Sequence, residues 1–484
     1  MANRGEIAVR VIRACRDLGL RAVAVYSPVD RHAAHVRLAD QAYPLPGDSP
    51  AESYLNAAAL IDIARSAGVG ALHPGYGFLA ENAAFAHACE AAGLIFVGPP
   101  AGVLAACGDK AQTRDRLAAA GIRVLPGTGP LADPEVESAA ARVGFPLLIK
   151  AAGGGGGKGI HFVGARHELR DKVHIARGEA QAAFGDDRIY LERALTDARH
   201  VEVQILADRG GRVVALGERD CSVQRRHQKL IEETPAPGLD RDLRGRMLDA
   251  AVAGAKAIGY VNAGTFEFLV KGSDFFFLEV NARLQVEHPI TEAVTGLDLV
   301  ALQLRIAQGG ELSTLETPVP RGHAIECRIS AEDPHEAFLP SIGRVEAVVE
   351  PSGPGVRVDS GILPGVEVTR HYDPLLAKVI TWGATREDAM ARMRRALSEM
   401  AVAGVATTVP FHLWALGDPE FTSGRHTTGF VTGWETRVQG RHELEAVIAA
   451  AAAVYQEEQQ MRLPTAPAPR RWINTAREEG LRDA

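Results

Sequence analysis

The segment TFEFLVKGSDFFFLEVNAR, residues 265–283, is rich in aromatic and β-branched side chains on both sides of a turn signal. This pattern is typical of two β-strands joined by a tight turn, since Gly, Ser and Asp are common turn residues. We predict a hairpin with the three-residue loop Gly272-Ser273-Asp274, in which Lys271 pairs with Phe275. These pairings fix the register of the whole hairpin.

That register brings two acidic side chains together: Glu267 lies opposite Glu279, and Asn281 follows on the same face. Two opposed carboxylates repel each other, and a cation between them removes the repulsion. An all-oxygen ligand set favours Mg²⁺ or Mn²⁺, bridging to a nucleotide. The alternative is that both glutamates face solvent on an ordinary hairpin. The opposite face is expected to point into the core through Phe266, Phe268, Phe276 and Leu278.

A second segment, KAAGGGGGKGIHFV at residues 150–163, places five glycines between two lysines. Glycine runs let backbone N–H groups approach an anion, because no side chain intervenes. The apolar flanks FPLLIK and GIHFVG predict strands, so a flap tip that contacts phosphate is favoured over a flexible linker. The P-loop pattern is excluded, because Ala152 and Gly159 occupy positions where it requires Gly and Ser or Thr. The glycines are Gly153, Gly154, Gly155, Gly156 and Gly157.

The composition excludes several classes of protein. The 484 residues are 46% hydrophobic, enough for roughly two to four packed domains. A formal net charge of −7, spread along the chain, argues against a nucleic-acid binder. The charged N-terminus and short apolar runs argue against a signal peptide and a membrane span. The five cysteines are dispersed without a C-x-x-C pair, which is typical of a protein of the reducing cytoplasm. We expect all five to be core or near-core residues.

The order of predicted elements divides the chain into parts. Up to residue 99, helical and strand patterns alternate, which predicts a parallel, doubly wound sheet. No strand precedes the first helix, so either this sheet is one strand short or the gene model starts late. From about residue 101 the pattern is mixed α+β with antiparallel strands. A strand-rich part begins near Arg321 and closes with an amphipathic helix at 385–400.

Two further motifs carry charged groups. In NARLQVEHPITE, Glu287 is either a general base or a helix-start carboxylate beside the core histidine His288. ERDCSVQRRHQK gathers basic residues that form either a solvated face or, beside phosphates, an anion site. The residues alone leave these alternatives open.

Taken in order, these motifs resemble the biotin carboxylase family of the ATP-grasp enzymes. The resemblance covers nearly the whole body of the chain. It rests on ANRGEIAVR, HPGYGFLAEN, GDK, IKAAGGGGGKG, RHVEVQ, ERDCSVQRRHQK, GTFEF, EVNARLQVEHPITE, GHAIECRISAED and YDPLLAKV.

The resemblance implies an α/β and α+β fold in several domains. A Rossmann-like parallel-sheet N-terminal domain spans 1–100 and lacks the family's first strand. An ATP-grasp domain spans 101–320, with a glycine-rich lid at about 122–194. A β-rich C-terminal domain spans 321–437, and residues 438–484 form a helical tail that could dock a partner.

The resemblance also implies a reaction. ATP phosphorylates bicarbonate to carboxyphosphate, and the carboxyl group then passes to N1 of biotin. Glu287 matches the general base that takes the bicarbonate proton, and Lys229 and Arg283 match the bicarbonate contacts. Arg328 matches the arginine that stabilises the biotin enolate.

The remaining matches concern ATP and its metal. Glu267, Glu279 and Asn281 match the metal ligands, in agreement with the hairpin argument. The expected nucleotide contacts are the flap glycines together with Lys110, Lys150, Glu192, Arg193, Leu195, His200, Gln224, His227 and Leu269. Ala194 stands where relatives often carry an aromatic residue, so we expect a looser adenine pocket.

The expected partners follow from the same resemblance. None of the six methionines adjoins a lysine, so the biotin-acceptor Met-Lys-Met is absent. A biotin carboxyl carrier protein and a separate carboxyltransferase are therefore expected as partners. Acetyl-CoA is the expected final acceptor of the carboxyl group, as in fatty acid biosynthesis. The chain itself is expected to form a homodimer. The alternatives are a non-catalytic scaffold within such a complex, or another ATP-grasp ligase that joins a carboxylate to an amine.

Overall fold

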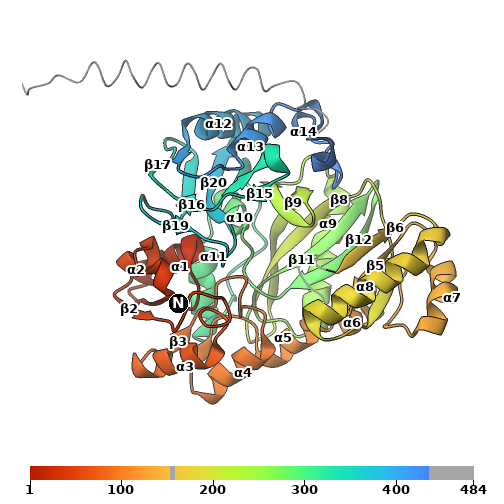
Figure 1. The fold of residues 1–484 in the computed structure, drawn as a ribbon, viewed down its shortest axis with the longest axis horizontal. Helices are drawn as coiled ribbons and strands as arrows, with labels where there is room; N and C mark the ends of the chain where they lie inside the picture. Colours follow the sequence, from red (N-terminus) through yellow and green to blue (C-terminus); the bar gives the residue numbers. More distant parts are fainter. Residues whose placement is uncertain (153–158, 435–484) are drawn as a thin grey trace, which may run out of the picture. The chain divides into compact units, whose positions relative to one another are not determined.

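The computed structural model describes residues 1–152 and 159–434 (Figure 1). The glycines predicted to form the flap tip, 153–157, and the predicted tail, 438–484, lie outside the described residues. Among the helices of the described part, none is long and apolar enough to cross a membrane.

The N-terminal part alternates helices and short strands, as predicted. Its helices are α1 (Gly5–Asp17), α2 (Ala34–Leu38), α3 (Ala57–Ser66) and α4 (Ala83–Ala91). Its strands are β1 (Val23–Tyr26), β2 (Gln41–Pro44), β3 (Ala71–Leu72) and β4 (Ile95–Phe96). Each pairing is parallel, β1 with β2 and β3 with β4.

The predicted continuous sheet is instead two separate two-stranded sheets. The first residues of the chain lie between them. The Met1 amino group donates to the carbonyl of Val23 at 2.6 Å, and the Ala2 amide donates to the carbonyl of His73 at 3.0 Å. Two isolated hydrogen bonds do not make a ladder, so β1 and β3 are bridged here without being joined into one sheet.

The lid is a small antiparallel sheet in the order β6-β5-β7, packed against α8 (Figure 1). It contains α7 (Asp133–Val143), β5 (Leu147–Ala151), β6 (Ile160–Val163), α8 (Leu169–Phe184) and β7 (Ile189–Arg193). Both predicted flanks of the glycine run are strands, and they pair directly, Lys150 opposite Ile160. The helices α5 (Ala101–Gly108) and α6 (Lys110–Ala119) precede the lid.

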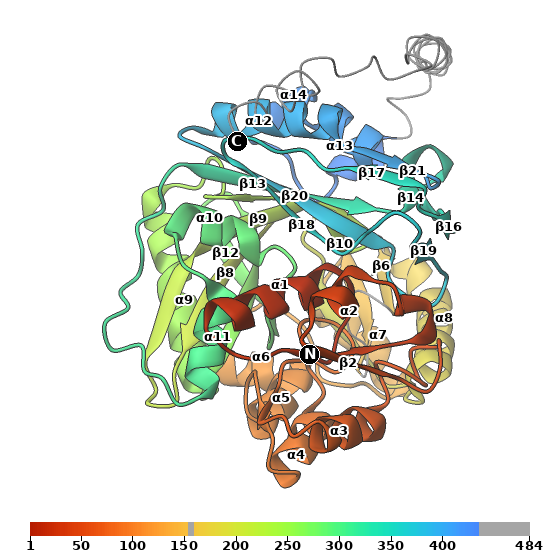
Figure 2. The same cartoon turned by 90° about the vertical axis from the view of Figure 1, so that its left-hand side faces the viewer.

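The body is organised by one eight-stranded antiparallel sheet, in the order β12-β11-β8-β9-β10-β13-β20-β18 (Figures 1 and 2). Its strands are β8 (Arg199–Ala207), β9 (Val213–Arg225), β10 (Gln228–Thr234), β11 (Asn262–Lys271), β12 (Asp274–Asn281), β13 (His323–Ser330), β18 (Val356–Ser360) and β20 (Leu375–Gly383). The strand-rich part predicted from Arg321 therefore continues the central sheet, because β13 pairs with β10.

Helices cover this sheet and short strands surround it. The helices are α9 (Arg241–Ala257), α10 (His288–Thr295), α11 (Leu299–Ala307), α12 (Arg386–Glu399), α13 (Val409–Ala415) and α14 (Pro419–Thr422). The short strand pairs are β14 (Glu332–Asp333) with β15 (Leu339–Pro340), β16 (Gly343–Arg344) with β19 (Glu367–Val368), and β17 (Ala347–Val349) with β21 (Ala401–Ala403). Helix α9 packs on β8 and β9, whereas α10 packs on β9, β10, β13 and β20.

The predicted hairpin forms as β11 and β12, with a different loop. Lys271 pairs with Asp274 rather than with Phe275, so the loop has only two residues, and its Gly272 takes a φ of +62°. A bulge then shifts the register between Phe268 and Glu267. The two changes cancel, and the predicted pairing of Glu267 with Glu279 is confirmed.

Because of the same two changes, the prediction that Phe276 and Leu278 point into the core from β12 is wrong. Phe275 and Phe277 are buried, whereas Phe276 and Leu278 are only partly buried. Phe277 packs against Phe266 and Phe268, with both pairs of ring centroids 6.2 Å apart. The prediction for β11 is confirmed, since Phe266 and Phe268 are fully buried.

A buried charge cluster joins β10 to helix α12. The Glu233 carboxylate accepts hydrogen bonds from Arg386 at 2.6 and 2.9 Å, and it lies 2.7 Å from a ring nitrogen of His323. Burial opposes ionisation of Glu233, but hydrogen bonds from His323 and Arg386 lower its pKa to about 2.

This pKa predicts a loss of stability in acid. A carboxyl with a depressed folded-state pKa contributes stability above its unfolded pKa, and this contribution disappears as the pH falls toward the folded value. Between about pH 4.5 and pH 2, the free energy of unfolding should fall by roughly 3 kcal/mol more in the wild type than in Glu233→Gln. Urea unfolding across this pH range measures the difference, and parallel curves for the two proteins would contradict the prediction.

Candidate active site

A row of charged side chains crosses four neighbouring strands of the central sheet. Glu279 on β12 pairs with Glu267 on β11, which pairs with Glu202 on β8, which pairs with Arg219 on β9. Directly paired residues share a face of the sheet, so these four side chains lie side by side. Arg219 is fully buried and donates to Glu202 at 2.6 Å. Glu202 was not among the predicted site residues.

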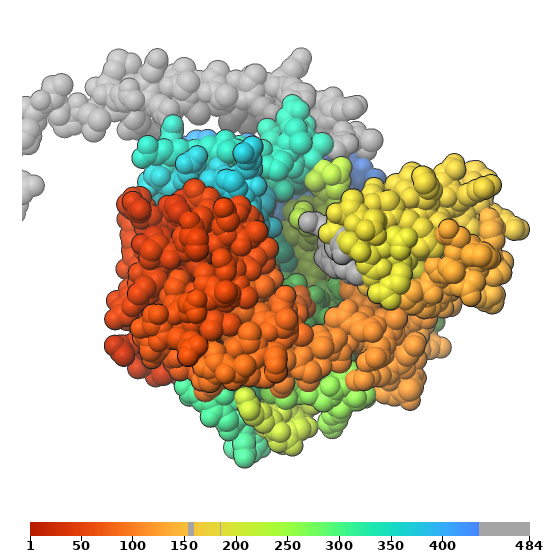
Figure 3. All heavy atoms as spheres, turned by 60° about the horizontal axis from the view of Figure 1, so that its bottom comes forward, coloured from red at the N-terminus to blue at the C-terminus, as the bar shows by residue number. Residues whose placement is uncertain are grey.

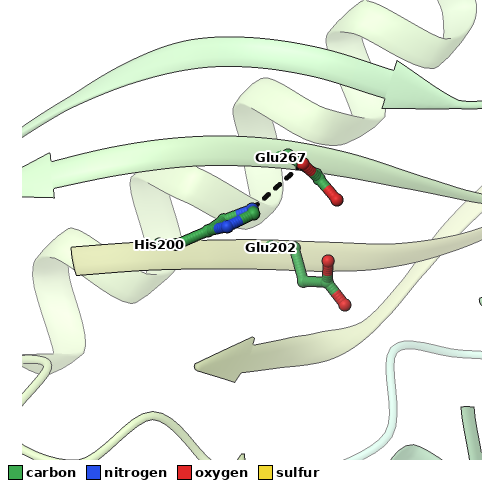
Figure 4. Close-up of side chains that lie close together, drawn as sticks. All are labelled: His200, Glu202 and Glu267. Atoms are coloured by element: carbon green, nitrogen blue, oxygen red, sulfur yellow. Dashed lines mark ion pairs between the residues drawn. The ribbon is translucent and has the colours of Figure 1, made fainter. Parts of the chain in front are cut away.

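The Lys229 side chain, from β10, lies among three carboxylates. Its Nζ atom donates to Glu202 at 2.5 Å, to Glu267 at 2.8 Å and to Glu287 at 2.7 Å. Figure 4 shows Glu202 and Glu267 extending from adjacent strands, with His200 3.0 Å from Glu267. The predicted residues Lys229, Glu267 and Glu287 therefore meet at one point of the sheet.

The electrostatics of this cluster follow from its burial. Burial alone would lower the pKa of Lys229, but the carboxylates of Glu202, Glu267 and Glu287 overcome it and raise that pKa well above its usual range. Burial likewise opposes ionisation of Glu287, and Lys229 and Arg328 hold its pKa well below the usual range. Lys229 and Glu287 are therefore kept in their ionised forms by their neighbours, whereas burial raises the pKa of Glu202 despite Arg219 and Lys229.

Glu287 is held from a second side by Arg328 on β13. The Arg328 guanidinium donates to Glu287 at 2.9 Å and to Glu232 on β10 at 2.6 Å. Burial, only partly offset by Arg328, raises the pKa of Glu232 to about 7. Glu287 directly precedes α10, so the interpretation as a helix-start carboxylate is confirmed, and its side chain also faces Lys229 and Arg328.

The three predicted metal ligands lie at the other end of the row. Asn281 donates to Glu267 at 2.7 Å, and Lys110 from α6 donates to Glu279 at 2.6 Å. The Glu279 side chain is 29% exposed, so a cation can reach it from solvent. Two carboxylates and an amide oxygen on one hairpin are hard donors, and this set fits Mg²⁺ or Mn²⁺.

The predicted nucleotide contacts lie around this end of the sheet. The side chain of Lys150 on β5 forms an ion pair with Glu192 on β7 within the lid. His200 lies 3.2 Å from the Gln224 amide and is directly opposite Leu269 on the neighbouring strand.

His227 lies in a turn of the central sheet. It follows Arg226 in the β9–β10 turn, where both residues have positive φ. Burial and the charges of Lys150 and His200 lower the pKa of His227, whereas Glu279 opposes the shift.

Leu195 is partly buried and lies just after β7. Arg193 is the last residue of β7, and its backbone N–H donates to the Pro126 carbonyl at 2.7 Å. Ala194 is 7% exposed. The structure thus places the predicted hinge residues together at the end of the lid sheet.

The molecular surface is hollowed between the N-terminal part and the lid. Figure 3 shows this hollow between the red and orange N-terminal residues and the yellow lid, with green residues visible inside it. Green is the colour of the central strands that carry the row of charges. A cleft that opens between two parts is a common place for a ligand site.

Arg283 does not reach Glu287 through a hydrogen bond. It donates to Glu81 at 2.8 Å and to the side chain of Gln285 at 3.2 Å. Glu81 belongs to the HPGYGFLAEN motif of the N-terminal part, so Arg283 joins that part to the site. Sequence reasoning missed Glu81, Glu202 and Glu232, because their contacts join elements distant in sequence, and it also missed Gln285, which contacts the nearby Arg283.

Comparison with known proteins identifies the chain as an ATP-dependent ligase that forms a carbon–nitrogen bond. The chain matches "Biotin carboxylase, N-terminal domain" over residues 1–104, "Carbamoyl-phosphate synthase L chain, ATP binding domain" over 109–315, and "Biotin carboxylase C-terminal domain" over 326–433.

Whole relatives are similar along nearly their full length. Biotin carboxylase 1 of Bacillus subtilis is 48% identical over 440 residues, which cover 90% of this chain and 98% of that protein. One of the pyruvate carboxylase subunits of Methanothermobacter thermautotrophicus is 48% identical over 434 residues, covering 89% of this chain and 88% of that protein. The chain therefore belongs to the biotin carboxylase family.

A solved structure has the same fold. It is the biotin carboxylase domain dimer of the 2-oxoglutarate carboxylase of Hydrogenobacter thermophilus, in complex with MgADP, ADP and bicarbonate. The TM-score is 0.87 at 44% sequence identity, and the match covers 89% of this chain and 96% of that chain.

The Lys229 cluster predicts a large effect of removing its cation. Lys229→Met leaves buried carboxylates facing each other, and we expect the free energy of unfolding to fall by about 3–5 kcal/mol. The matched control is Lys271→Met, whose exposed side chain donates only to the Thr196 carbonyl and whose loss should cost less than about 0.5 kcal/mol. Urea unfolding measures both, and equal effects would show that Lys229 does not hold the cluster together.

Proposed function

We propose that this chain carboxylates biotin carried on a separate protein, using ATP and bicarbonate, with carboxyphosphate as the intermediate. The observation that carries the proposal is the position of Glu287 between Lys229 and Arg328, next to the carboxylate pair Glu267 and Glu279. A base and two cations beside a candidate metal site provide what activation of a small anion by ATP requires.

Glu287 is the proposed base that takes the proton from bicarbonate. In the structure Lys229 and Arg328 hold its pKa well below the usual range despite burial, which makes it a weaker base. Bicarbonate that binds Lys229 and Arg283 would compete with Glu287 for Lys229. A weaker interaction between Lys229 and Glu287 would raise the pKa of the Glu287 carboxyl. Substrate binding would thus make the base able to accept the proton when bicarbonate is in place.

The nucleotide is proposed to bind between the lid and the central sheet. Lys110, Lys150 and His200 would contact its phosphates, and the hinge residues Glu192, Arg193 and Leu195 would meet the adenine, with Gln224, His227 and Leu269 beside them. Glu267, Glu279 and Asn281 would hold Mg²⁺ or Mn²⁺, which neutralises charge on the transferred phosphoryl group. Closure of the lid would exclude water from the labile carboxyphosphate.

Arg328 is proposed to stabilise the biotin enolate. Its guanidinium is fixed by Glu232 and Glu287, so its remaining donors are held in a defined direction. N1 of biotin then attacks the carboxyl carbon while its own proton passes to the phosphate leaving group, and the C–O bond to phosphate breaks.

We further propose that a carrier protein brings the biotin and that a separate carboxyltransferase consumes the product, with this chain acting as a homodimer. The final acceptor is chosen by the carboxyltransferase, and acetyl-CoA is the acceptor that we propose. A solved relative is described as a dimer, and one relative belongs to a pyruvate carboxylase, so the proposed half-reaction is compatible with more than one acceptor.

The proposal predicts a biotin-stimulated, bicarbonate-dependent release of ADP. Purified protein is mixed with Mg-ATP, with and without bicarbonate and free biotin, and ADP is measured. Glu287→Gln should lower the biotin-stimulated rate about 100- to 10,000-fold, because the amide cannot accept the proton. ADP release that ignores bicarbonate, or that survives Glu287→Gln unchanged, would contradict the proposed function. A folded, ATP-binding protein with no turnover would favour the scaffold alternative.

A second prediction concerns the metal ligands. Glu279→Gln removes one negative donor, so the Mg²⁺ concentration that gives half of the maximal rate should rise at least about 10-fold. The control Glu399→Gln changes an exposed glutamate that pairs only with Arg395 and should leave this concentration unchanged. The result that would exclude Glu279 as a ligand is an identical Mg²⁺ dependence in the two variants.

A further inference from the structure

Lys378 on β20 is a fully buried lysine that lies beside the catalytic cluster without belonging to it. It pairs directly with Arg328 across the β13–β20 ladder. Two cations in such a pair repel each other, so sheets normally avoid this arrangement. Their positions therefore require anionic or dipolar partners close to both.

The two cations hold neighbouring residues of one segment. Arg328 donates to the side chain of Glu287 at 2.9 Å, and Lys378 donates to the backbone carbonyl of Val286 at 2.7 Å. This segment, residues 284–287, connects β12 to α10 and is buried throughout. Val286 and Glu287 are thus held by two neighbouring strands, one through the backbone and the other through the side chain.

Lys378 also meets carboxylates from two other elements. Its Nζ lies 3.2 Å from Glu6 on α1 and 3.9 Å from Asp359 on β18. Glu6 in turn accepts a hydrogen bond from the Tyr76 hydroxyl, in the HPGYG motif. The lysine therefore joins the N-terminal part and the edge of the central sheet to segment 284–287.

We propose that Lys378 is a positioning residue for Glu287, which it holds in place between Lys229 and Arg328 by fixing the Val286 carbonyl. The inference rests on the proposed function, in which Glu287 is the base. Other charged groups near Lys378 are Glu326 and Arg357. Arg357 already pairs with Asp359 and Glu292, and Glu326 has no hydrogen-bond partner among the described residues. Lys378 is thus the side chain that links this charge network to the backbone next to Glu287.

The simplest variant, Lys378→Met, leaves Glu6 without its buried cation and so lowers stability as well as activity. The double variant Lys378→Met with Glu6→Gln removes that unpaired charge but still leaves the Val286 carbonyl unheld. Activity is expressed per mole of bound nucleotide, which counts only folded protein. We expect the double variant to regain most of the lost melting temperature, while its kcat stays about 100-fold below that of Glu6→Gln, with KM for ATP unchanged.

The matched control is Arg386→Met, which takes a cation from the buried carboxylate of Glu233 without touching segment 284–287. It should lose stability but keep its kcat per bound nucleotide. If Lys378 only balances charge, the double variant will regain activity together with stability, and that result would overturn the inference.

Failure of the proposed function can be recognised separately. A wild-type protein without bicarbonate-dependent ADP release would reject the function, whatever the variants do. The positioning role would then be tested by a crystal structure of the double variant, in which residues 284–287 should move away from Lys229 and Arg328. A segment that superimposes on the wild type would reject the positioning role on its own.

Discussion

The buried ammonium group of Lys229 is the interaction on which the site depends. Glu202, Glu267 and Glu287 come from three different elements, and without a cation among them they would repel one another in a region shielded from water. One lysine on β10 brings them together and helps to lower the pKa of Glu267 and of Glu287. The same lysine is proposed to bind bicarbonate, so the group that holds the carboxylates together is also the group through which substrate would influence the base.

The fold makes this arrangement possible through the register of one antiparallel sheet. Each strand of the row β12-β11-β8-β9 contributes one charged side chain at a paired position, and β10 and β13 supply Lys229 and Arg328. Apolar residues such as Phe266 and Phe268 occupy the alternate positions, where they pack into the core. On β11, the alternation of Glu267 with Phe266 and Phe268 thus separates the charged face from the core across a single layer of backbone.

The sequence predicted the local features of the site but not its long-range contacts. The pairing of Glu267 with Glu279 could be predicted because a hairpin is local, although the prediction was right only because a shorter loop and a bulge compensate for each other. Glu202, Glu81 and Lys378 could not be found in this way. Their partners lie on strands or loops far away in sequence, and an acidic or basic residue in an isolated strand does not show which neighbour it will meet. The N-terminal sheet was predicted as continuous for a related reason, since periodicity identifies strands but not which strands pair.

The most direct test of the central claim is the charge state of Lys229 itself. The ¹⁵N chemical shift of its Nζ, assigned by comparison with Lys229→Arg, would be followed by NMR from neutral pH to beyond pH 10.5, the ordinary pKa of lysine. If the three carboxylates hold the ammonium as described, the signal will keep the shift of a charged amine throughout this range. A titration at or below pH 10.5 would show that burial outweighs the carboxylates, and the account of the site would be wrong.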